Sequence, residues 1–113
     1  GGFGGGSGGG VNPVPGLFGG NSSGSKAGGG AGLGGAIFFR AGSLRLIKAS
    51  FSNNSALAGA PTNTPATPGS AKGGAIFALG TTVFQMDLTF AGNVAANAGT
   101  ATDDNADIFL TAP

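Results

Sequence analysis

The apolar residues of this chain fall into short runs separated by glycine-rich or polar connections. Residues 37–39 and 75–79 are short apolar runs, and residues 44–51 and 83–90 alternate between apolar and polar positions with a period of two. Such runs and such alternation are typical of β-strands. A last apolar run, 108–110, follows Asp107 near the end of the sequence. Nothing has the 3.6-residue period of a helix, so the pattern predicts an all-β chain.

The two alternating runs also predict which side chains face inward. The predicted inner face consists of Ile47, Ala49, Phe51, Met86, Leu88 and Phe90. In the first run the apolar phase slips at Leu46 and Ile47. A slip of this kind is typical of a corner or bulge between two short strands.

The chain repeats itself at a fixed spacing. The stretch from Gly34 to Asn54 recurs without a gap from Gly73 to Asn93, which is 39 residues later (73 minus 34). A fixed period indicates one supersecondary unit stacked on itself. This period is too long for one strand pair, and the repeat is too poor in helix formers for a strand-helix unit. The predicted fold is a parallel β-helix of about three turns with long surface loops.

Stacked turns place equivalent side chains on one another in ladders, about 4.8 Å apart. The predicted ladders are Ile37, Ile76 and Ile108; Phe38, Phe77 and Phe109; Phe51 and Phe90; and Asn54 and Asn93. The apolar ladders fill the core, and the Asn amides bond from turn to turn. The same overlay predicts an exposed ion pair between Lys48 and Asp87, worth about 0–1 kcal/mol.

Glycine and proline dominate the beginning of the chain. Residues 1–16 are predicted to be a Gly/Pro-rich arm, and residues 17–113 the β-helix domain. Residues 1–10 have the composition of a flexible linker. Ordering such a tract is costly in entropy, so we expect an ordered one to be held against another part of the chain or a neighbouring molecule. Residues 59–70, which contain three prolines, are predicted to be a surface excursion.

The composition leaves few groups for chemistry. The 113 residues include 26 Gly but no Cys or His, and only 8% are charged. A net charge of +1 without a basic cluster argues against a nucleic-acid partner. The lack of Cys excludes disulfides and thiolate metal sites. No apolar run approaches the roughly 20 residues of a membrane-spanning helix. The chain begins Gly-Gly, so we expect it to be a processed product or a piece of a longer protein.

Two paired motifs resemble a known family. Gly34-Gly35-Ala36-Ile37 with Phe51-Ser52-Asn53-Asn54, and Gly73-Gly74-Ala75-Ile76 with Phe90-Ala91-Gly92-Asn93, resemble the Gly-Gly-Ala-Ile and Phe-x-x-Asn motifs of chlamydial-type polymorphic outer membrane proteins. The resemblance covers residues 17–110. It implies a right-handed parallel β-helix and an extracellular or cell-surface location, as in adhesins of that type and in related extracellular repeat proteins. The chain departs from the family in having no Cys, no membrane barrel and no long run of repeats.

One acidic cluster is the candidate site for a metal or for hydrolysis. Asp103, Asp104 and Asp107 fit the start of a calcium loop or a pair of catalytic carboxylates. Ile108 stands where the calcium loop needs Gly, and the given sequence ends before a distal Glu could appear. A solvated turn that enters a strand is the favoured interpretation, so we predict no catalytic residue, no metal and no cofactor.

The remaining candidate residues are two arginines and two asparagines. Arg40 and Arg45 flank one turn and suit the binding of a glycan carboxylate, although solubilising arginines are commoner on such a face. Asn21 and Asn53 fit the N-glycosylation pattern, which applies only in a eukaryotic source.

These features together predict a non-enzymatic extracellular structural protein. The expected role is a building block of a surface fibre, sheath or appendage that assembles by end-to-end stacking. Its partners would be further copies of itself or other β-helical surface proteins. One alternative is a segment of an adhesin passenger that binds a host or glycan ligand through residues 59–70. A second alternative is a polysaccharide-active β-helix.

Overall fold

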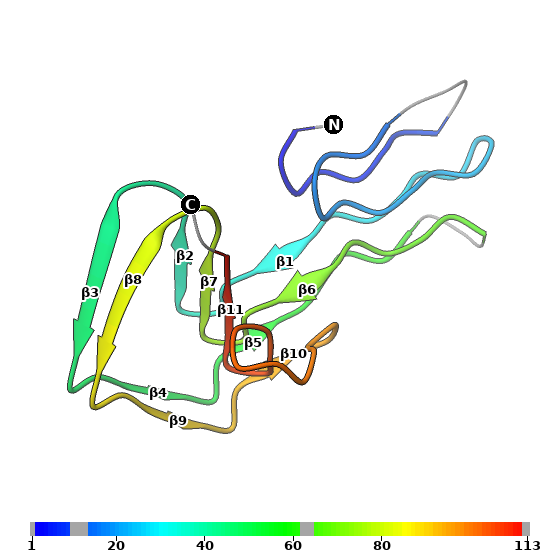
Figure 1. Cartoon of the computed structure of the whole chain (residues 1–113). Coiled ribbons are helices and arrows are strands. Elements are labelled where there is room, and N and C mark those ends of the chain that lie inside the picture. Colours follow the sequence, from blue (N-terminus) through cyan, green and yellow to red (C-terminus); the bar gives the residue numbers. More distant parts are fainter. Residues whose placement is uncertain (1, 10–13, 62–64, 112–113) are drawn as a thin grey trace. The chain divides into compact units, whose positions relative to one another are not determined.

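The computed structural model describes residues 2–9, 14–61 and 65–111. Over these ranges the chain forms eleven short strands and no helix, so the all-β prediction is confirmed (Figure 1). The strands are β1 (Gly32–Leu33), β2 (Ile37–Phe39), β3 (Ser43–Ile47), β4 (Ser50–Ser52), β5 (Ser55–Ala56), β6 (Ala71–Lys72), β7 (Ile76–Ala78), β8 (Thr82–Met86), β9 (Thr89–Ala91), β10 (Val94–Ala95) and β11 (Ile108–Leu110).

The strands form small sheets and the chain forms two compact units. The sheets are β1 with β6, β2 with β7 and β11, β3 with β8, β4 with β9, and β5 with β10. Unit 1 consists of Gly1–Gly32 and Leu57–Ala71, and unit 2 consists of Leu33–Ala56 and Lys72–Pro113.

In unit 2 the two copies of the repeat lie side by side in parallel register. Ile37 pairs with Ile76, and Phe51 pairs with Phe90, so the offset is 39 residues in both sheets (76 minus 37 and 90 minus 51). The same offset holds for β3 with β8 and for β5 with β10. On the other side of β7, Ile108 pairs with Ile76 after only 32 residues (108 minus 76). The sequence repeat is therefore a repeat of parallel strand pairings.

Residues with positive φ form the corners between these strands. Lys48 and Asp87, at equivalent places in the two repeats, have φ of 52° and 54°. The slip in the apolar pattern at Leu46 and Ile47 is therefore a corner, as predicted, because β3 ends at Ile47 and β4 begins at Ser50. Since the chain turns here, the alternation before the corner does not continue in phase after it.

This change of phase corrects the predicted inner face at two positions. Ile47 and Met86, which were expected to face inward, are 43% and 47% exposed. Leu46 packs against the core in place of Ile47. After the corner, Phe51 and Phe90 are partly buried, as the pattern predicts. One unbroken alternation through both strands therefore predicts the wrong face before the corner, because Lys48 and Asp87 have left-handed backbone conformations.

The core of unit 2 is centred on the middle strand of its only three-stranded sheet among the described residues. The side chains of Ile76 and Phe77 on β7 are fully buried. They lie between β2 on one side and β11 on the other. On the Ile76 side of β7, Ile76 forms a cluster with Ala75 and Ile108, and five partly buried side chains pack against it: Ile37, Leu46, Phe51, Phe90 and Leu110.

Unit 1 is a bundle of extended glycine-rich segments, which we call the glycine bundle: 2–9, 14–22, 26–32, 57–61 and 65–71. The backbone of segment 26–32 hydrogen-bonds to each of the other four segments. A strand in a sheet has hydrogen-bonded neighbours on two sides only. The arrangement is therefore not a β-sheet.

The hydrogen bonds of the glycine bundle recur at every third residue. Pairs of backbone donors and carbonyl acceptors are Gly28 to Ser7 with Ala31 to Gly4, Gly29 to Thr67 with Gly32 to Ser70, and Thr67 to Asn21 with Ser70 to Phe18. Three residues per turn is the period of a polyproline II helix, which makes no hydrogen bonds within itself. Its N–H groups are free to reach several neighbours. Outside the turns at Gly4 and Phe18, which have φ of 77° and 68°, the hydrogen bonds between the segments therefore have the period of polyproline II helices.

Glycine is required where these segments touch. A methyl group added to Gly20 would overlap the carbonyl oxygen of Thr67, and one added to Gly29 would overlap that of Gly59. The expectation that the N-terminal tract is held against another part of the chain is confirmed for residues 2–9.

The prediction of a surface excursion at residues 59–70 is only partly correct, and residues 62–64 of it lie outside the described ranges. Pro65 and Pro68 are exposed, but Ala66 is buried. The N–H of Thr67 donates to the carbonyl of Asn21 at 2.9 Å. The excursion is therefore built into the glycine bundle, because its small side chains allow the neighbouring segments to approach.

Candidate functional site

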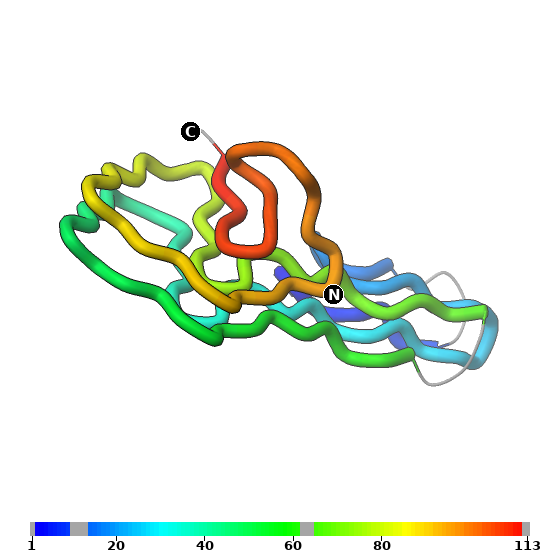
Figure 2. Tube along the Cα trace, turned by 90° about the horizontal axis from the view of Figure 1, so that it is seen from below, coloured from blue at the N-terminus to red at the C-terminus, as the bar shows by residue number. Residues whose placement is uncertain are grey.

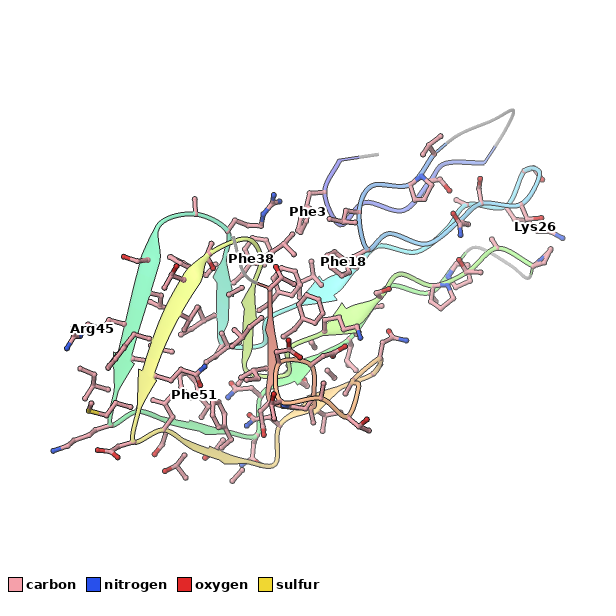
Figure 3. All side chains as sticks on the ribbon, viewed as in Figure 1. Phe3, Phe18, Lys26, Phe38, Arg45 and Phe51 are labelled. Atoms are coloured by element: carbon pink, nitrogen blue, oxygen red, sulfur yellow. The ribbon has the colours of Figure 1, made fainter. Side chains whose placement is uncertain are left out.

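The candidate site of this protein is the set of side-chain ladders in unit 2, together with the strand edges on which they end. Phe77 lies between Phe38 and Phe109, with ring centroids 5.4 and 5.2 Å away and planes inclined by 3° and 11°. Phe51 stacks on Phe90 at 5.5 Å with planes inclined by 16°. Each ladder joins register partners of neighbouring strands, and Phe38 and Phe51 are its members in the first repeat (Figure 3).

The aliphatic ladder follows the same register. Ile37 and Ile108 are both partners of Ile76, on opposite sides of β7. The structure thus brings together every side chain that the sequence predicts to stack in the apolar ladders.

The polar ladder is centred on Asn93, which is 6% exposed. Its Oδ1 accepts hydrogen bonds from the backbone N–H and the side-chain amide of Asn54, at 2.9 and 3.1 Å. Its Nδ2 donates to the carbonyl of Phe51 and to Oδ1 of Asp107, both at 3.0 Å. Both donors and the acceptor of this buried amide are used. Asp107, which precedes β11, extends the polar ladder to a partial third repeat that consists of β11 and the turn before it. This contact was not predicted from the sequence.

A second contact holds the turn before β11 against β6. Lys72 donates from Nζ to Oδ2 of Asp104 at 2.8 Å and lies 5.5 Å from the centre of the Phe109 ring. This hydrogen bond is the main cause that lowers the pKa of Asp104 below its ordinary value of 3.8. The N–H of Gly99, which donates to Oδ1 of the same carboxylate at 3.2 Å, acts in the same direction, whereas desolvation opposes both.

The Lys72–Asp104 pair predicts a pH-dependent effect of Lys72→Met. A carboxyl whose pKa is lowered in the folded state contributes stability above its ordinary pKa and loses it as the pH falls through the lowered value. The pair is partly exposed, so we expect Lys72→Met to lower the free energy of unfolding by about 1 kcal/mol or less at neutral pH. The deficit should shrink as the pH falls below 3.8 and through the lowered pKa of Asp104.

Urea unfolding of the wild type and of Lys72→Met, at neutral pH and in acid, measures this effect, with Lys48→Met as the control. A deficit that persists in acid would instead assign the effect to packing of the Lys72 stem on Phe109.

The predicted ion pair between Lys48 and Asp87 is wrong. In the part of the chain that the structure describes, the ion pair formed is Lys72–Asp104, and Lys48 is not within reach of a carboxylate. Both Lys48 and Asp87 are exposed corner residues. Pairing two solvated side chains gains too little to fix their conformations.

The acidic residues do not form one site. Asp103 is exposed, Asp104 bonds Lys72 and Asp107 bonds Asn93. The Oδ1 of Asn105 accepts from the backbone N–H of Asp107 at 2.9 Å, so it serves the turn before β11. Over the described ranges, no three acidic, His or Cys side chains gather as metal ligands would.

The outer face of β3 and β8 carries the arginine that the sequence analysis singled out. Arg45 points away from the ladders, and its guanidinium lies 4.8 Å from the centre of the Phe84 ring (Figure 3). Ile47 and Met86 are in register beside this pair. Arg40 follows β2 at an exposed position.

The two candidate glycosylation residues are both exposed but differ in backbone conformation. Asn21 lies in the glycine bundle, where its N–H donates to the Thr67 hydroxyl at 2.8 Å. Asn53 is a corner residue with φ of 56°, next to the polar ladder.

Comparisons of the chain with protein-family models, with curated proteins and with solved structures found no match. In addition, none of the described segments is a helix with the length and apolarity needed to cross a membrane.

The strand edges are the remaining feature of the site. Among the described strands, β3, β4 and β5 pair on one side only, as do their partners β8, β9 and β10. The Phe38 ring, which ends the longest ladder, is 48% exposed. Unpaired edges of this kind are templates for pairing with another chain.

Proposed function

We propose that unit 2 is a short parallel β-helix and that the chain is a non-enzymatic structural protein of the cell surface or the extracellular space. In this proposal copies stack end to end through their strand edges and form a fibre, sheath or appendage. The right-handed coil and the surface location rest on the resemblance of the Gly-Gly-Ala-Ile and Phe-x-x-Asn motifs.

The observation that carries the proposal is the constant register of the two repeats. Because β2, β3, β4 and β5 all pair with the next repeat at one offset, each edge of unit 2 presents the same sequence of parallel positions. A first repeat of another copy therefore fits the second repeat of this one with the same side-chain pairs. The exposed ring of Phe38 would then be covered as Phe77 is within the chain.

Assembly of the purified chain tests this function. We expect elongated particles whose length grows with concentration in light scattering and electron microscopy. Oriented material should give a diffraction spacing of about 4.8 Å along the particle axis. A sharply monomeric folded species at micromolar concentration would contradict the proposal.

A charge at the exposed end of the ladder should block stacking. Phe38→Lys is expected to reduce assembly, because a buried ammonium without a partner is unfavourable at the new interface. Leu57→Lys is the matched control, since Leu57 is an exposed apolar residue of the glycine bundle. Circular dichroism confirms that both variants fold. Equal assembly of the two variants would argue against stacking through this edge.

A further inference from the structure

The third repeat occupies one side of unit 2 only. β11 pairs with β7, whereas in the described part of the chain β8, β9 and β10 have no third strand beside them. Figure 2 shows the chain between β10 and β11 as a compact curl at this end, coloured orange to red. At this end of unit 2, β11 therefore forms a step that projects one strand spacing beyond β8, β9 and β10.

This step limits how a second copy can be added. The first repeat of a second copy brings its β2, β3 and β4 as one continuous turn. If that copy's β2 lay on β11, its β3 and β4 would stand one strand spacing, about 4.8 Å, too far from β8 and β9. Pairing along all sides requires the second copy's β2 to lie directly on β7, where β11 is.

β2 and β11 suit the same place on β7. Both are parallel to β7, and both put an isoleucine beside Ile76. Both also stack a phenylalanine on Phe77, at nearly equal centroid distances of 5.4 and 5.2 Å. The aliphatic and aromatic ladders would therefore continue unchanged if β2 of another copy replaced β11.

We propose that β11 is an exchangeable strand. It covers β7 in the single chain, and β2 of a second copy displaces it when chains stack. This inference rests on the proposed function and adds the step by which an end becomes competent to grow. The exchange gives up the Lys72–Asp104 and Asn93–Asp107 contacts. It gains new strand pairing along β8, β9 and β10, three sides that the single chain leaves open.

Locking β11 in place tests the exchange. Ala78 and Leu110 are register partners in β7 and β11. Neighbouring positions in parallel strands are within the Cα separation that a disulfide needs. The chain has no Cys of its own, so the double variant Ala78→Cys with Leu110→Cys has one possible intramolecular disulfide.

The matched control locks the other neighbour of the same residue. Phe39 is the register partner of Ala78 in β2, so Ala78→Cys with Phe39→Cys ties β2 to β7, a pairing that stacking does not break. Both variants are purified as oxidised monomers and followed by light scattering and sedimentation, with and without reductant.

We expect the β11-locked chain to remain a single chain until reductant is added, and the β2-locked chain to assemble in both states. Assembly of the oxidised β11-locked chain to the extent of its reduced form would overturn the exchange and leave stacking intact. Absence of assembly in every form, wild type included, would overturn both the exchange and the proposed function.

Discussion

Replacing Gly6 by alanine is expected to destabilise the glycine bundle by about 1–3 kcal/mol, the usual cost of overpacking. A methyl group at this position would overlap the carbonyl oxygen of Gly28 and lie 2.6 Å from that of Gly29. Both obstacles are backbone atoms, which cannot turn aside as a side chain can. The segments 2–9 and 26–32 would have to separate and would lose the hydrogen bonds between them.

The same replacement at Gly8 should have the opposite sign. No atom lies within 4 Å of a methyl group there, and Gly8 is not among the glycines with positive φ. Alanine then restricts the unfolded chain without straining the folded one, which stabilises by about 0.4–1 kcal/mol. Gly8 lies two residues from Gly6 in the same segment, so the two variants differ in packing and not in composition.

Amide hydrogen exchange separates the two variants best. The N–H groups of Gly28 and Ala31 donate to Ser7 and Gly4 and report directly on this contact. They should exchange faster in Gly6→Ala and no faster in Gly8→Ala. Equal protection in both variants would mean that segment 2–9 does not pack as described.

Replacing Asn93 by alanine is expected to lower the free energy of unfolding of unit 2 by about 2–4 kcal/mol. The substitution removes four hydrogen bonds at a buried position and leaves the Phe51 carbonyl and the Asn54 amide without these partners. Each buried polar group left unsatisfied costs about 1–3 kcal/mol. Chemical denaturation of the single chain, with the midpoint and slope compared, measures this loss.

Asn54→Ala is the matched control, because the Asn54 side chain donates one hydrogen bond of the polar ladder, to Oδ1 of Asn93, from a less buried position. Its expected cost is about 1 kcal/mol. If the two variants lost equal stability, the number of bonds made by Asn93 would not be what matters.

Asn93→Asp adds a pH signature to the same position. The new carboxylate would replace the donor that now lies 3.0 Å from Oδ1 of Asp107. Two carboxylates this close repel unless one is protonated. The folded state therefore binds a proton more tightly than the unfolded state, and stability should rise as the pH falls from about 7 toward about 4. Asn93→Ala should show no such rise.

The sequence was sufficient for the pairing of the repeats, because a gapless period translates directly into register. Phe51 and Phe90 could be matched from spacing alone, and the structure places them in contact. The corner at Lys48 was also visible as a slip of the apolar phase. The exposure of Ile47 and Met86 was not predicted, because a residue with positive φ shifts the alternation by one position. In the first repeat the inward-facing residues change from even numbers before the corner to odd numbers after it.

The glycine bundle was not predictable in the same way. Polyproline II segments make no internal hydrogen bonds and carry no apolar period, so their sequence looks like that of a linker. What distinguishes them is contact between segments far apart in the chain, such as Gly29 with Thr67. A composition of glycines and small residues permits that contact without specifying the partner. The Lys72–Asp104 and Asn93–Asp107 contacts were missed because the third repeat departs from the regular spacing.

The contrast between Phe38 and Phe77 bears on how the proposed column of stacked chains would respond to heating. One ring is half open to water and the other, held between two neighbours, is fully shielded. If copies stack as proposed, each added copy would turn an outer ring into an inner one, so the thermal stability should rise with column length and approach a plateau. Short columns would unfold at lower temperature than long ones, and chains would dissociate first from the ends.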